Sequence, residues 1–595
     1  MRAIRSLSII VSAYIVLSII FTWPLITKIA TAGFGHDEDS PYHIWHNWWF
    51  KYSVFDLKQN PLYTNYIFHP QKINLIYDAN AFVFSAMTLP IQALTNNVVL
   101  SSNIIFLLSF ALSGLFAFIL ADDILKNKPL AFLCGFIFAL NPYTLAQAID
   151  GHINLTSTWM IPLYTFFLLK SLNSGMSDKV FRIQNFKFQI AAGITAALQL
   201  YNDFTYSAFL IIETVIIFGF FVYSSRCSEE RIKPIKKQLF TGLVVAGTAS
   251  IIGSPLLYEV VVAAKGGLKA SSPTWVQNVW SADLLTFIRP NDQTTFLKNP
   301  WTPQIGTVEG TAFLGYSVIV LAVIYLLLRI TKRLQATAGE NLMLVLTISF
   351  FLLMLGPSIH YRNSFQFPFF GTQFIFPLPY LILHKIPFIG ETQEPGRMFP
   401  FLILPLSMLA SSALGQMSKN LKKSIFYLLL TSYFLLLAIE YLPLPFPTTD
   451  LSSKPIFDII QKDPENKAVL VLPLGFNSGN YVLGPSPIGS LQFYQAYFRK
   501  PSFRGTVARL PYSTFEYYQN LPLIPYLIDP KRDLKDSDLD KTTGLKILKD
   551  RLNVKYVIVI EDKYKGPMGQ TYQILENTLG ATKFYDEGRV KGYIL

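Results

Sequence analysis

Apolar runs of about 20 residues recur along most of the chain, and a helix needs this length to cross the hydrocarbon core of a membrane. Charged residues make up only 15% of the chain, against about 25% in soluble domains. The segment 373–390 is broken by prolines, and we interpret it as re-entrant or interfacial. The sequence therefore predicts an α-helical polytopic membrane protein with about eleven spans, at residues 7–27, 98–120, 129–147, 154–172, 188–201, 204–224, 239–262, 312–330, 341–357, 398–415 and 424–442.

The N-terminal segment has two interpretations. Arg2 and Arg5 precede an apolar run, and Ala30-Thr31-Ala32 is similar to the small-residue site at which a signal peptide is cleaved. The run from Leu7 to Ile26 is longer than the ~7–15 residues of a usual signal core. This length favours an uncleaved first helix.

The distribution of Lys and Arg predicts the orientation, because cytoplasmic loops carry the excess of positive charge. With the N-terminus in the cytoplasm, the short inner loops hold 19 of the 50 Lys and Arg residues, and the longer outer loops hold 11. The remaining 20 lie beyond residue 442. We therefore predict a multi-pass protein of the plasma or inner membrane with an extracytoplasmic C-terminal region. The net charge of +13 does not indicate a nucleic acid partner.

Two domains are predicted. Residues 1–442 form the transmembrane domain, with a long first outer loop at 28–97, and residues 443–595 form a small extracytoplasmic α/β domain. In the second domain, alternating and helical patterns predict three strands and one helix, at 467–475, 554–562 and 590–595 and at 542–553.

Carboxylates of the membrane part fall on the predicted outer side, where a converging set suits a cation site or a general base. Asp150 and Asp203 lie in two short turns that contain no basic residue. For any single residue, a polar loop end is the ordinary explanation. The outer set comprises Asp37, Glu38, Asp39, Asp150, Asp203, Asp283, Asp292, Glu309, Glu391 and Glu394.

The stretch GFGHDEDSPYHIWHNWWF, residues 33–50, predicts a short helix behind the acidic triplet 37–39. Ser40 suits the N-cap and Pro41 the first helical position. The triplet precedes the helix N-terminus, where backbone N–H groups favour negative charge. We expect an interfacial amphipathic helix with an aromatic belt on one face, formed by Tyr42, Trp45, Trp48 and Trp49.

The opposite face of this helix carries His43, His46 and Asn47. Asp39 and the two histidines could ligate a metal, or the histidines could simply hydrogen-bond their neighbours. Arg397, in IGETQEPGRMF, could clamp a phosphate or pair with a nearby glutamate. Arg289, in SADLLTFIRPND, lies on the same predicted side.

These residues carry a resemblance to the C-type (GT-C) membrane glycosyltransferases, a superfamily that includes protein O-mannosyltransferases and lipid-A sugar transferases. Asp37-Glu38-Asp39 is similar to the acidic motif of their long first outer loop. A poorly characterised prokaryotic group within the superfamily resembles nearly the whole chain, at Asp39 before the Trp-x-x-Trp-Trp run and at IDGHINLTSTWMIPL, SADLLTFIRP, VEGTAFLGY and LNVKYVIVIED. The stretch NWWF differs from the WWDYG signature of oligosaccharyltransferases, so transfer of a whole glycan to asparagine is not expected.

The resemblance implies transfer of a sugar from a polyprenyl-phosphate donor to a hydroxyl group of an extracytoplasmic acceptor, which is a cell-envelope glycan, lipid or protein. Asp37 or Asp39 would be the general base, with Glu38 and Asp150 as further catalytic candidates. An Arg, or a cation such as Mg²⁺ or Mn²⁺ held by Asp37 and Asp39 with His43 and His46, would stabilise the departing phosphate. Substrate contacts would come from Trp45, His152, Arg289, Glu309, Glu394 and Arg397.

Three other functions remain open. A lipid or polysaccharide flippase would show internal repeats and charges at the membrane midplane, whereas this sequence has no repeat and one midplane acid, Glu213. A metal-dependent membrane hydrolase would use Asp39, His43 and His46, with His152 as a fourth ligand. A non-catalytic scaffold of the cell envelope is the third alternative.

Overall fold

The structure is a computed structural model. It describes the chain apart from residues 1, 174–182, 225–231, 266–273, 291–310, 387, 391, 393, 480, 486–487, 529–540 and 565–568. Two compact units are present, and each is described by itself. The helical unit comprises residues 1–27, 104–257 and 270–447, and the mixed unit comprises residues 28–103, 258–269 and 448–595. The first loop therefore packs with the C-terminal region, an association that the sequence did not predict.

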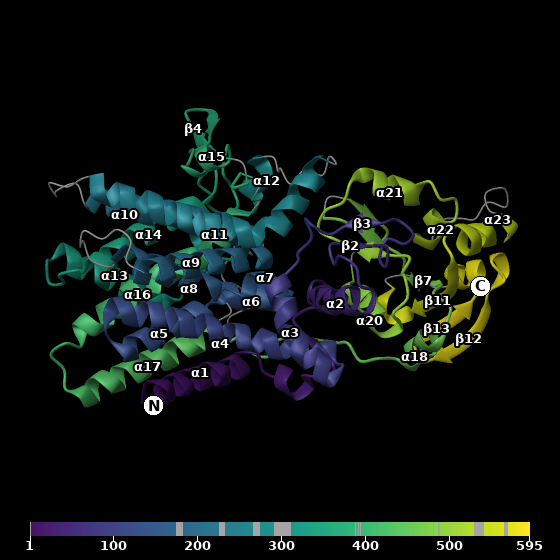
Figure 1. Ribbon diagram of the computed structural model, residues 1–595, viewed down its shortest axis with the longest axis horizontal. Coiled ribbons are helices and arrows are strands. Elements are labelled where there is room, and N and C mark those ends of the chain that lie inside the picture. The colour runs from purple at the N-terminus through teal and green to yellow at the C-terminus, as the bar shows by residue number, and fades with distance from the viewer. Residues whose placement is uncertain are drawn as a thin grey trace. The chain divides into compact units, whose positions relative to one another are not determined.

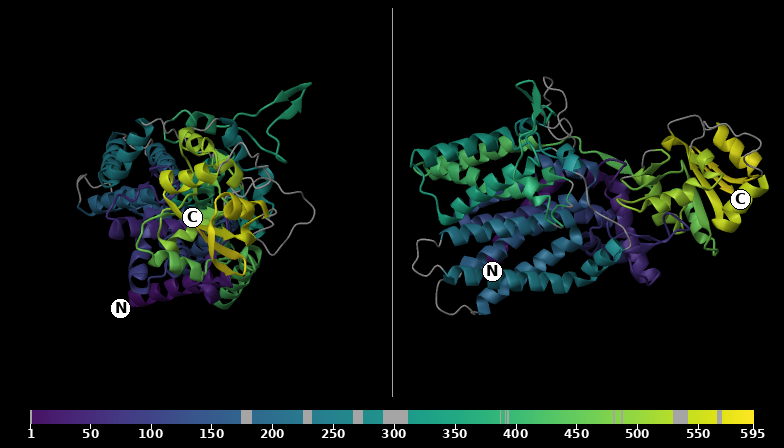
Figure 2. Two further views of the ribbon diagram at one scale, coloured as in Figure 1. Left: turned by 90° about the vertical axis from the view of Figure 1, so that its right-hand side faces the viewer. Right: turned by 90° about the horizontal axis from the view of Figure 1, so that it is seen from above.

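The helical unit is built from long apolar helices that lie side by side (Figures 1 and 2). Within the described residues, six helices are long and apolar enough to cross a membrane, and four more are shorter and apolar. The predicted number of eleven spans is therefore not established. The helices are α1 (Arg2–Phe21), α4 (Val98–Leu125), α5 (Lys128–Ala139), α6 (Pro142–Asp150), α7 (Ile153–Thr156), α8 (Met160–Asn173), α9 (Ile183–Asn202), α10 (Phe204–Ser224), α11 (Ile232–Lys265), α12 (Thr274–Val279), α13 (Tyr316–Ile330), α14 (Ala338–Met354), α15 (Tyr380–Leu383), α16 (Phe399–Met417) and α17 (Lys423–Tyr441).

The predicted helix 129–147 is divided into α5 and α6. Asn141 adopts an extended conformation, and its side chain accepts a hydrogen bond from the Thr144 N–H at 2.8 Å. Pro142 disfavours the helical conformation for the residue before it and suits the first turn of the next helix. The Asn-Pro pair thus ends one helix and caps another, a local signal that the prediction missed.

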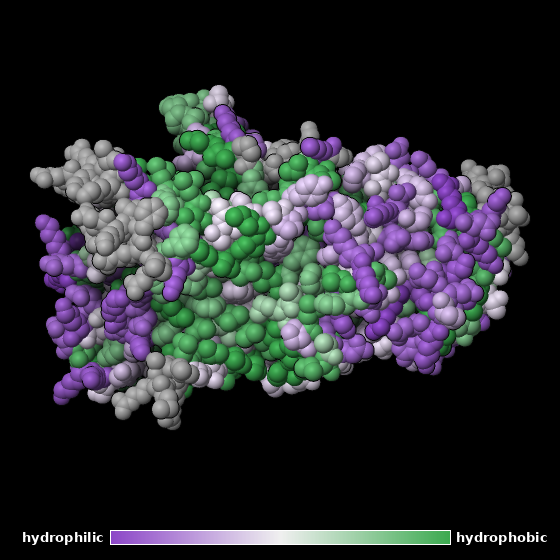
Figure 3. All heavy atoms as spheres, viewed as in Figure 1, coloured by the Kyte–Doolittle hydropathy of each residue, from purple (hydrophilic) through white to green (hydrophobic). Residues whose placement is uncertain are grey.

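Hydrophobic residues cover the sides of the long helices on the face shown in Figure 3, and hydrophilic residues gather at their ends. Exposed apolar side chains on these helices include Leu243 of α11 (73% exposed), Ile330 of α13 (76%) and Leu428 of α17 (67%). Side chains of this kind are stable against lipid, where exposure carries no penalty. The chain is a membrane protein.

Close packing in the helical unit depends on two glycines that face Tyr14 of α1. The Tyr14 hydroxyl donates to the Phe132 carbonyl of α5 at 2.9 Å. A Cβ atom on Gly135 of α5 would lie 2.0 Å from the Tyr14 Oη, and one on Gly114 of α4 would lie 2.7 Å from the Tyr14 ring. The glycines therefore create the space that the Tyr14 ring fills.

The C-terminal part of the mixed unit contains a four-stranded sheet with the order β12-β13-β11-β7. Strand β7 (Ala468–Leu472) pairs parallel to β11 (Val554–Ile560), and β13 (Val590–Ile594) pairs antiparallel to β11. These three strands lie where the sequence predicted strands. Strand β12 (Thr582–Glu587) was not predicted, and the predicted helix 542–553 is α23 (Lys541–Lys546) followed by the short helix η6 (Ile547–Arg551).

Smaller elements complete the C-terminal part of the mixed unit. Strands β8, β9 and β10 form a three-stranded sheet. Their bounds and those of the short helices are α18 (Pro455–Lys462), β8 (Phe476–Asn477), β9 (Val482–Leu483), α19 (Gly489–Phe493), α20 (Gln495–Phe498), β10 (Gly505–Thr506), α21 (Tyr512–Gln519), α22 (Ile524–Ile528), η7 (Glu561–Lys563) and α24 (Gly569–Gln573).

The first loop contributes its own elements to the mixed unit, and β1 is joined to the C-terminal region by strand pairing. Strand β1 (Ala32–Phe34) pairs antiparallel with β6 (Thr448–Asp450). The other elements of the loop are α2 (Ser40–Lys51), β2 (Tyr63–Thr64), β3 (Ile73–Asn74) and α3 (Phe82–Thr95). Helix α3 is apolar and was not predicted.

The glycine contacts of Tyr14 generate a stability prediction. Gly135→Ala should lower the melting temperature of the detergent-purified protein, because overpacking costs about 1–3 kcal/mol. The matched control is Gly219→Ala in α10, where an added Cβ would meet no atom within 4 Å. The control should melt at or above the wild-type temperature, since Ala in a helix is favoured over Gly by about 1 kcal/mol. Equal melting of the two variants would contradict the packing described.

Candidate functional site

The acidic triplet lies where helix α2 of the mixed unit begins. Helix α2 begins at Ser40, and its N-cap residue is Asp39 rather than the predicted Ser40. Pro41 occupies the first turn, as predicted, and the Asp39 side chain makes no capping hydrogen bond. Glu38 is exposed, and Asp37 and Asp39 are half-buried. The three carboxylates therefore have different surroundings.

Asp37 is held by the C-terminal region. Its carboxylate accepts hydrogen bonds from the Ser490 backbone N–H and from the Ser490 hydroxyl, both at 2.9 Å, and pairs with the Lys563 ammonium. Its backbone carbonyl also accepts from the Gly489 N–H at 2.9 Å. The partner residues lie at the start of α19 (Gly489 and Ser490) and at the end of η7 (Lys563). The Asp37 carboxylate is therefore engaged by two hydrogen bonds and one ion pair, all from the C-terminal region.

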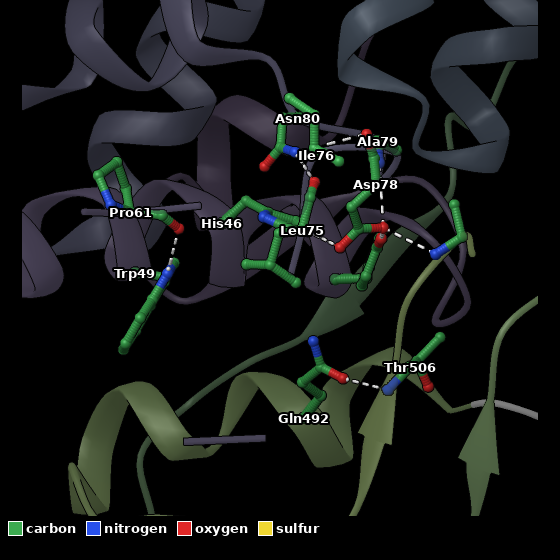
Figure 4. A network of polar contacts seen from close by, with 12 residues as sticks. His46, Trp49, Pro61, Leu75, Ile76, Asp78, Ala79, Asn80, Gln492 and Thr506 are labelled. Carbon is green, nitrogen blue, oxygen red and sulfur yellow. Dashed lines mark hydrogen bonds and ion pairs between the residues drawn. The ribbon is translucent and has the colours of Figure 1, made fainter. Parts of the chain in front are cut away.

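The tryptophans of α2 are core residues, and the predicted aromatic belt is wrong. Trp45 is 0% exposed and Trp49 is 1% exposed, and their rings stack with centroids 5.8 Å apart. The Trp45 Nε1–H donates to the Gln495 Oε1 at 2.8 Å, and the Trp49 Nε1–H donates to the Pro61 carbonyl at 2.9 Å (Figure 4 shows the second bond). Trp45 has no exposed surface for a substrate, so we withdraw it as a substrate contact.

The polar face of α2 is also buried, and its partner is a residue that sequence reasoning missed. The His46 Nε2 lies 3.1 Å from the Asp78 Oδ2 (Figure 4), and the Tyr42 hydroxyl donates to the Asp78 Oδ1. Asp78 also accepts from the backbone N–H groups of Ala79 at 3.0 Å and Ala508 at 2.7 Å. Burial raises the pKa of Asp78, but the His46 charge and these bonds outweigh it and lower the pKa.

Asp39 lies near this network. Burial, then the Asp78 carboxylate, and then the Asp39 charge raise the pKa of Tyr42 well above its usual value. No group of three or more His, Cys, Asp or Glu side chains in the described part of the chain is placed to hold a metal ion. The predicted ligand set of Asp37, Asp39, His43 and His46 is therefore not assembled as a metal site.

In the helical unit, Asp150 and His152 flank the turn after α6. Gly151 forms this turn with φ at +94°, a conformation that glycine adopts without strain. The His152 Nδ1 lies 2.5 Å from the Gln147 Oε1, and the His152 N–H donates to the Gln147 carbonyl at 2.9 Å. Both His152 and Asp150 are half-buried. The turn therefore holds the His152 ring against Gln147 of α6.

The turn after α6 and the turn before α10 meet. The Asn154 amide donates to the Asp203 Oδ2 at 2.8 Å, and the Asn202 amide donates to the Asn154 carbonyl at 3.1 Å. Burial raises the pKa of Asp203, and the Tyr206 N–H, Arg397 and the Asn154 amide offset only part of this effect. Arg397 thus supplies the positive charge that neither turn contains.

Arg397 pairs with a glutamate of the same short segment. The Arg397 guanidinium lies 3.6 Å from the Glu394 Oε2 across the short helix η5 (Pro395–Met398), and the phosphate-clamp interpretation stays a prediction. Asp283 accepts from the Leu285 N–H at 2.9 Å and from the Asn363 N–H at 2.8 Å, which makes it a structural cap. Arg289 is half-buried just beyond η3 (Leu284–Phe287). Asp292, Glu309 and Glu391 lie outside the described residues.

The predicted site residues are therefore distributed over both units. Asp37, Glu38, Asp39, His43 and His46 belong to the mixed unit, and Asp150, His152, Arg289, Glu394 and Arg397 belong to the helical unit. The hypothesis that Asp37 or Asp39 lines one cavity with Asp150 stays a prediction. Ser490, Gln495, Lys563 and Asp78 carry no local motif that marks them in the sequence.

Solved structures with similar folds are large membrane enzymes. The arabinofuranosyltransferase AftD from Mycobacteria matches with a TM-score of 0.60 at 12% identity, over 99% of this chain and 41% of that one. The apo oligosaccharyltransferase of Archaeoglobus fulgidus matches with a TM-score of 0.51 at 13% identity, over 99% and 74%. ArnT from Cupriavidus metallidurans in the apo state has a TM-score of 0.49 at 13% identity, over 100% and 98%. The first two likenesses show that the fold is that of the GT-C glycosyltransferases.

Comparison with protein families places the chain in one family. No curated protein matches the chain. The model of the family described as "Domain of unknown function (DUF6311)" matches residues 10–375, which is more than half of the sequence. The protein therefore belongs to this family, and its fold is GT-C.

Proposed function

We propose that the chain is an integral membrane glycosyltransferase that moves a sugar from a polyprenyl-phosphate donor to an acceptor hydroxyl outside the membrane. The observation that carries the proposal is the GT-C fold over 99% of the chain, in common with an arabinofuranosyltransferase and an oligosaccharyltransferase. Both names describe sugar transfer.

Asp39 is the proposed general base. Asp39 is the N-cap residue of α2 and is half-buried, and it stands directly before the buried helix that carries the tryptophans. Asp37 is bound to Ser490 and Lys563, and Glu38 is exposed. In the proposed step, the acceptor hydroxyl gives its proton to the Asp39 carboxylate, and the hydroxyl oxygen bonds to the anomeric carbon. The bond from that carbon to the phosphate oxygen breaks, and its electron pair leaves with the polyprenyl phosphate. Positioned bases of this kind contribute about 10²–10⁴-fold to a rate.

Asp37 is a proposed positioning residue. Asp37 precedes Asp39 by two residues in the chain. Its carboxylate is bound to the C-terminal region by a hydrogen bond from Ser490 and an ion pair with Lys563. These contacts fix the backbone of the triplet at the start of α2. The C-terminal region is therefore proposed to hold the base in place, which gives it a role in catalysis without contact to substrate. Its extracytoplasmic location is part of the same proposal.

Arg289 and Arg397 are the proposed binding residues for the donor phosphate. Guanidinium groups bind phosphate through paired hydrogen bonds. Both arginines belong to the helical unit, and Arg289 is half-buried just beyond η3.

The base assignment predicts that Asp39→Asn loses activity. With purified protein in lipid nanodiscs, radiolabelled polyprenyl-phosphate sugars and an envelope extract as acceptor, transfer by Asp39→Asn should fall by about 10²–10⁴-fold. The matched control is Glu38→Gln, an exposed carboxylate next to it in the chain, which should retain nearly wild-type rates. Wild-type transfer by Asp39→Asn would move the base elsewhere, with Asp150 next. Tight carrier binding without any transfer would favour a flippase or a scaffold.

The positioning role predicts non-additive effects at Asp37 and Lys563. Lys563→Met and Asp37→Asn should each lower kcat and leave KM for the donor unchanged, because neither residue touches substrate. The double variant should be no worse than the worse single variant, since each change breaks the same contact. Lys563→Arg, which keeps the charge, should restore most of the rate. Additive losses would contradict the shared contact.

The phosphate role predicts weaker binding of the lipid carrier. Arg397→Gln or Arg289→Gln should raise the Kd for polyprenyl phosphate by about 10–100-fold, because a hydrogen bond to a charged group contributes about 1.5–3 kcal/mol. Binding can be measured by titration of the nanodisc-embedded protein with the carrier alone. If both variants bind as tightly as wild type, neither arginine holds the phosphate.

A further inference from the structure

A β-hairpin projects from the helical unit between α14 and α16 (Figures 1 and 2). Strand β4 (Phe367–Phe369) pairs antiparallel with β5 (Thr372–Phe374), with Phe367 opposite Phe374. Phe370 and Gly371 at the tip have positive φ angles of 47° and 77°, as a tight two-residue hairpin turn requires. This segment begins before the predicted re-entrant piece 373–390 and ends within it.

Aromatic side chains cover one face of the hairpin and its tip, whereas the opposite face carries Pro368 and Gln373. Phe370 is 91% exposed and Phe369 is 56% exposed, and the side chains of 374–376 are each more than 40% exposed. The rings contact one another, with centroids 4.6 Å apart for Phe369 and Phe370 and 4.7 Å apart for Phe374 and Phe376. In water, a patch of this kind would be unfavourable, and monomeric soluble proteins rarely expose one without a use for it.

Charge is absent from this part of the chain. No Asp, Glu, Lys or Arg occurs from Asn363 to His384, although every hairpin residue except the half-buried Phe367 is exposed. Exposed loops of soluble proteins usually carry charged side chains. The uncharged stretch ends at Arg362 and at Lys385, both of which are exposed. The composition therefore matches a surface that does not face bulk water.

The position of the hairpin indicates what covers it. Figure 3 shows hydrophobic residues on the projecting hairpin and on the sides of the long helices beside it, with a few hydrophilic residues next to the hairpin. It belongs to the same unit as α13, α14 and α16, so its place beside these helices is part of one compact unit. A segment that projects sideways from membrane helices, beside their hydrophobic surfaces, extends towards lipid.

We propose that the hairpin inserts its aromatic tip, Phe369, Phe370 and Phe374, into the lipid–water interface of one membrane leaflet. The backbone excludes a deeper position. A two-stranded hairpin has unpaired N–H and C=O groups along both outer edges, and such edges are not tolerated in the hydrocarbon core. At headgroup depth, water and lipid polar groups satisfy these edges, and aromatic rings are favoured there. The hairpin thus acts as a lateral anchor for the helical unit.

The test measures the depth of the tip by fluorescence quenching. A single cysteine is placed at Phe370 in a full-length chain in which Cys134 and Cys227 are replaced by Ser. It is labelled with an environment-sensitive dye and reconstituted into phosphatidylethanolamine–phosphatidylglycerol vesicles. Quenchers are aqueous iodide and lipids that carry a nitroxide at a shallow or a deep position.

Two further cysteines calibrate the measurement. Asn420→Cys, in the exposed connection between α16 and α17, reports water. Leu428→Cys, on a 67% exposed position of the apolar helix α17, reports the hydrocarbon core. For Phe370→Cys we expect quenching by the shallow nitroxide to exceed quenching by the deep one, and iodide quenching to be several-fold weaker than at Asn420→Cys.

Two results would overturn the proposal. Iodide quenching at Phe370→Cys equal to that at Asn420→Cys would place the tip in water. Protection from iodide that disappears when the vesicles hold at most one copy each would show that a second copy of the chain covers the tip. A second label site, Phe369→Cys, guards against a local effect of the tip substitution. None of these outcomes depends on whether the protein transfers sugars.

Discussion

Complete burial of helix α2 is the constraint on which the mixed unit depends. Every residue from Ser40 to Trp49 is buried, and a helix buried on all sides needs protein all around it. The first loop supplies part of this cover through α3, and the C-terminal region supplies the rest through α19 and α20. Neither part alone could shield the three tryptophans and the two histidines. The loop and the C-terminal region therefore fold as one body.

Polar groups on α2 set the register of this association. Gln495 accepts from the Trp45 Nε1–H and donates to the carbonyls of Tyr66 and Lys500. Asn47 donates to the Ser102 hydroxyl and accepts from the Ser85 hydroxyl. A buried polar group that loses its partner costs about 1–3 kcal/mol, so a shift of one residue would be penalised several times over. The register of α2 also determines where the acidic triplet 37–39 lies, because the triplet directly precedes this helix.

Much of the helical unit was predictable because membrane spans leave a strong local signal. The predicted ends of α10, α16 and α17 agree with the structure to within two residues. The break at Asn141 was missed although its signal is local, since Pro142 lies within an otherwise apolar run. The identity of the hairpin 367–374 was missed because its strands are short and carry no alternation of polar and apolar residues.

The site was less predictable for a physical reason. An interfacial helix and a fully buried helix share the same period of 3.6 residues, so the pattern of α2 did not distinguish them. The distinction lies in its partners, and Gln495, Ser490 and Lys563 lie 450 residues or more along the chain from theirs. The sequence identified Asp37, Asp39, Asp150 and Asp203 as acidic candidates. It did not predict that each of these residues has different neighbours.

The separation between Trp45 and Gln495, 450 residues, has a consequence for biosynthesis. At ~5–20 residues per second, roughly 20 to 90 s pass between synthesis of α2 and synthesis of the segment that covers it. All the intervening membrane helices emerge during this interval. The tryptophans of the first loop therefore stay without the cover of α19 and α20 until Gln495 and its neighbours have been synthesised. Folding of the mixed unit depends on this late segment, and a chaperone that shields the first loop during the interval would protect it from aggregation.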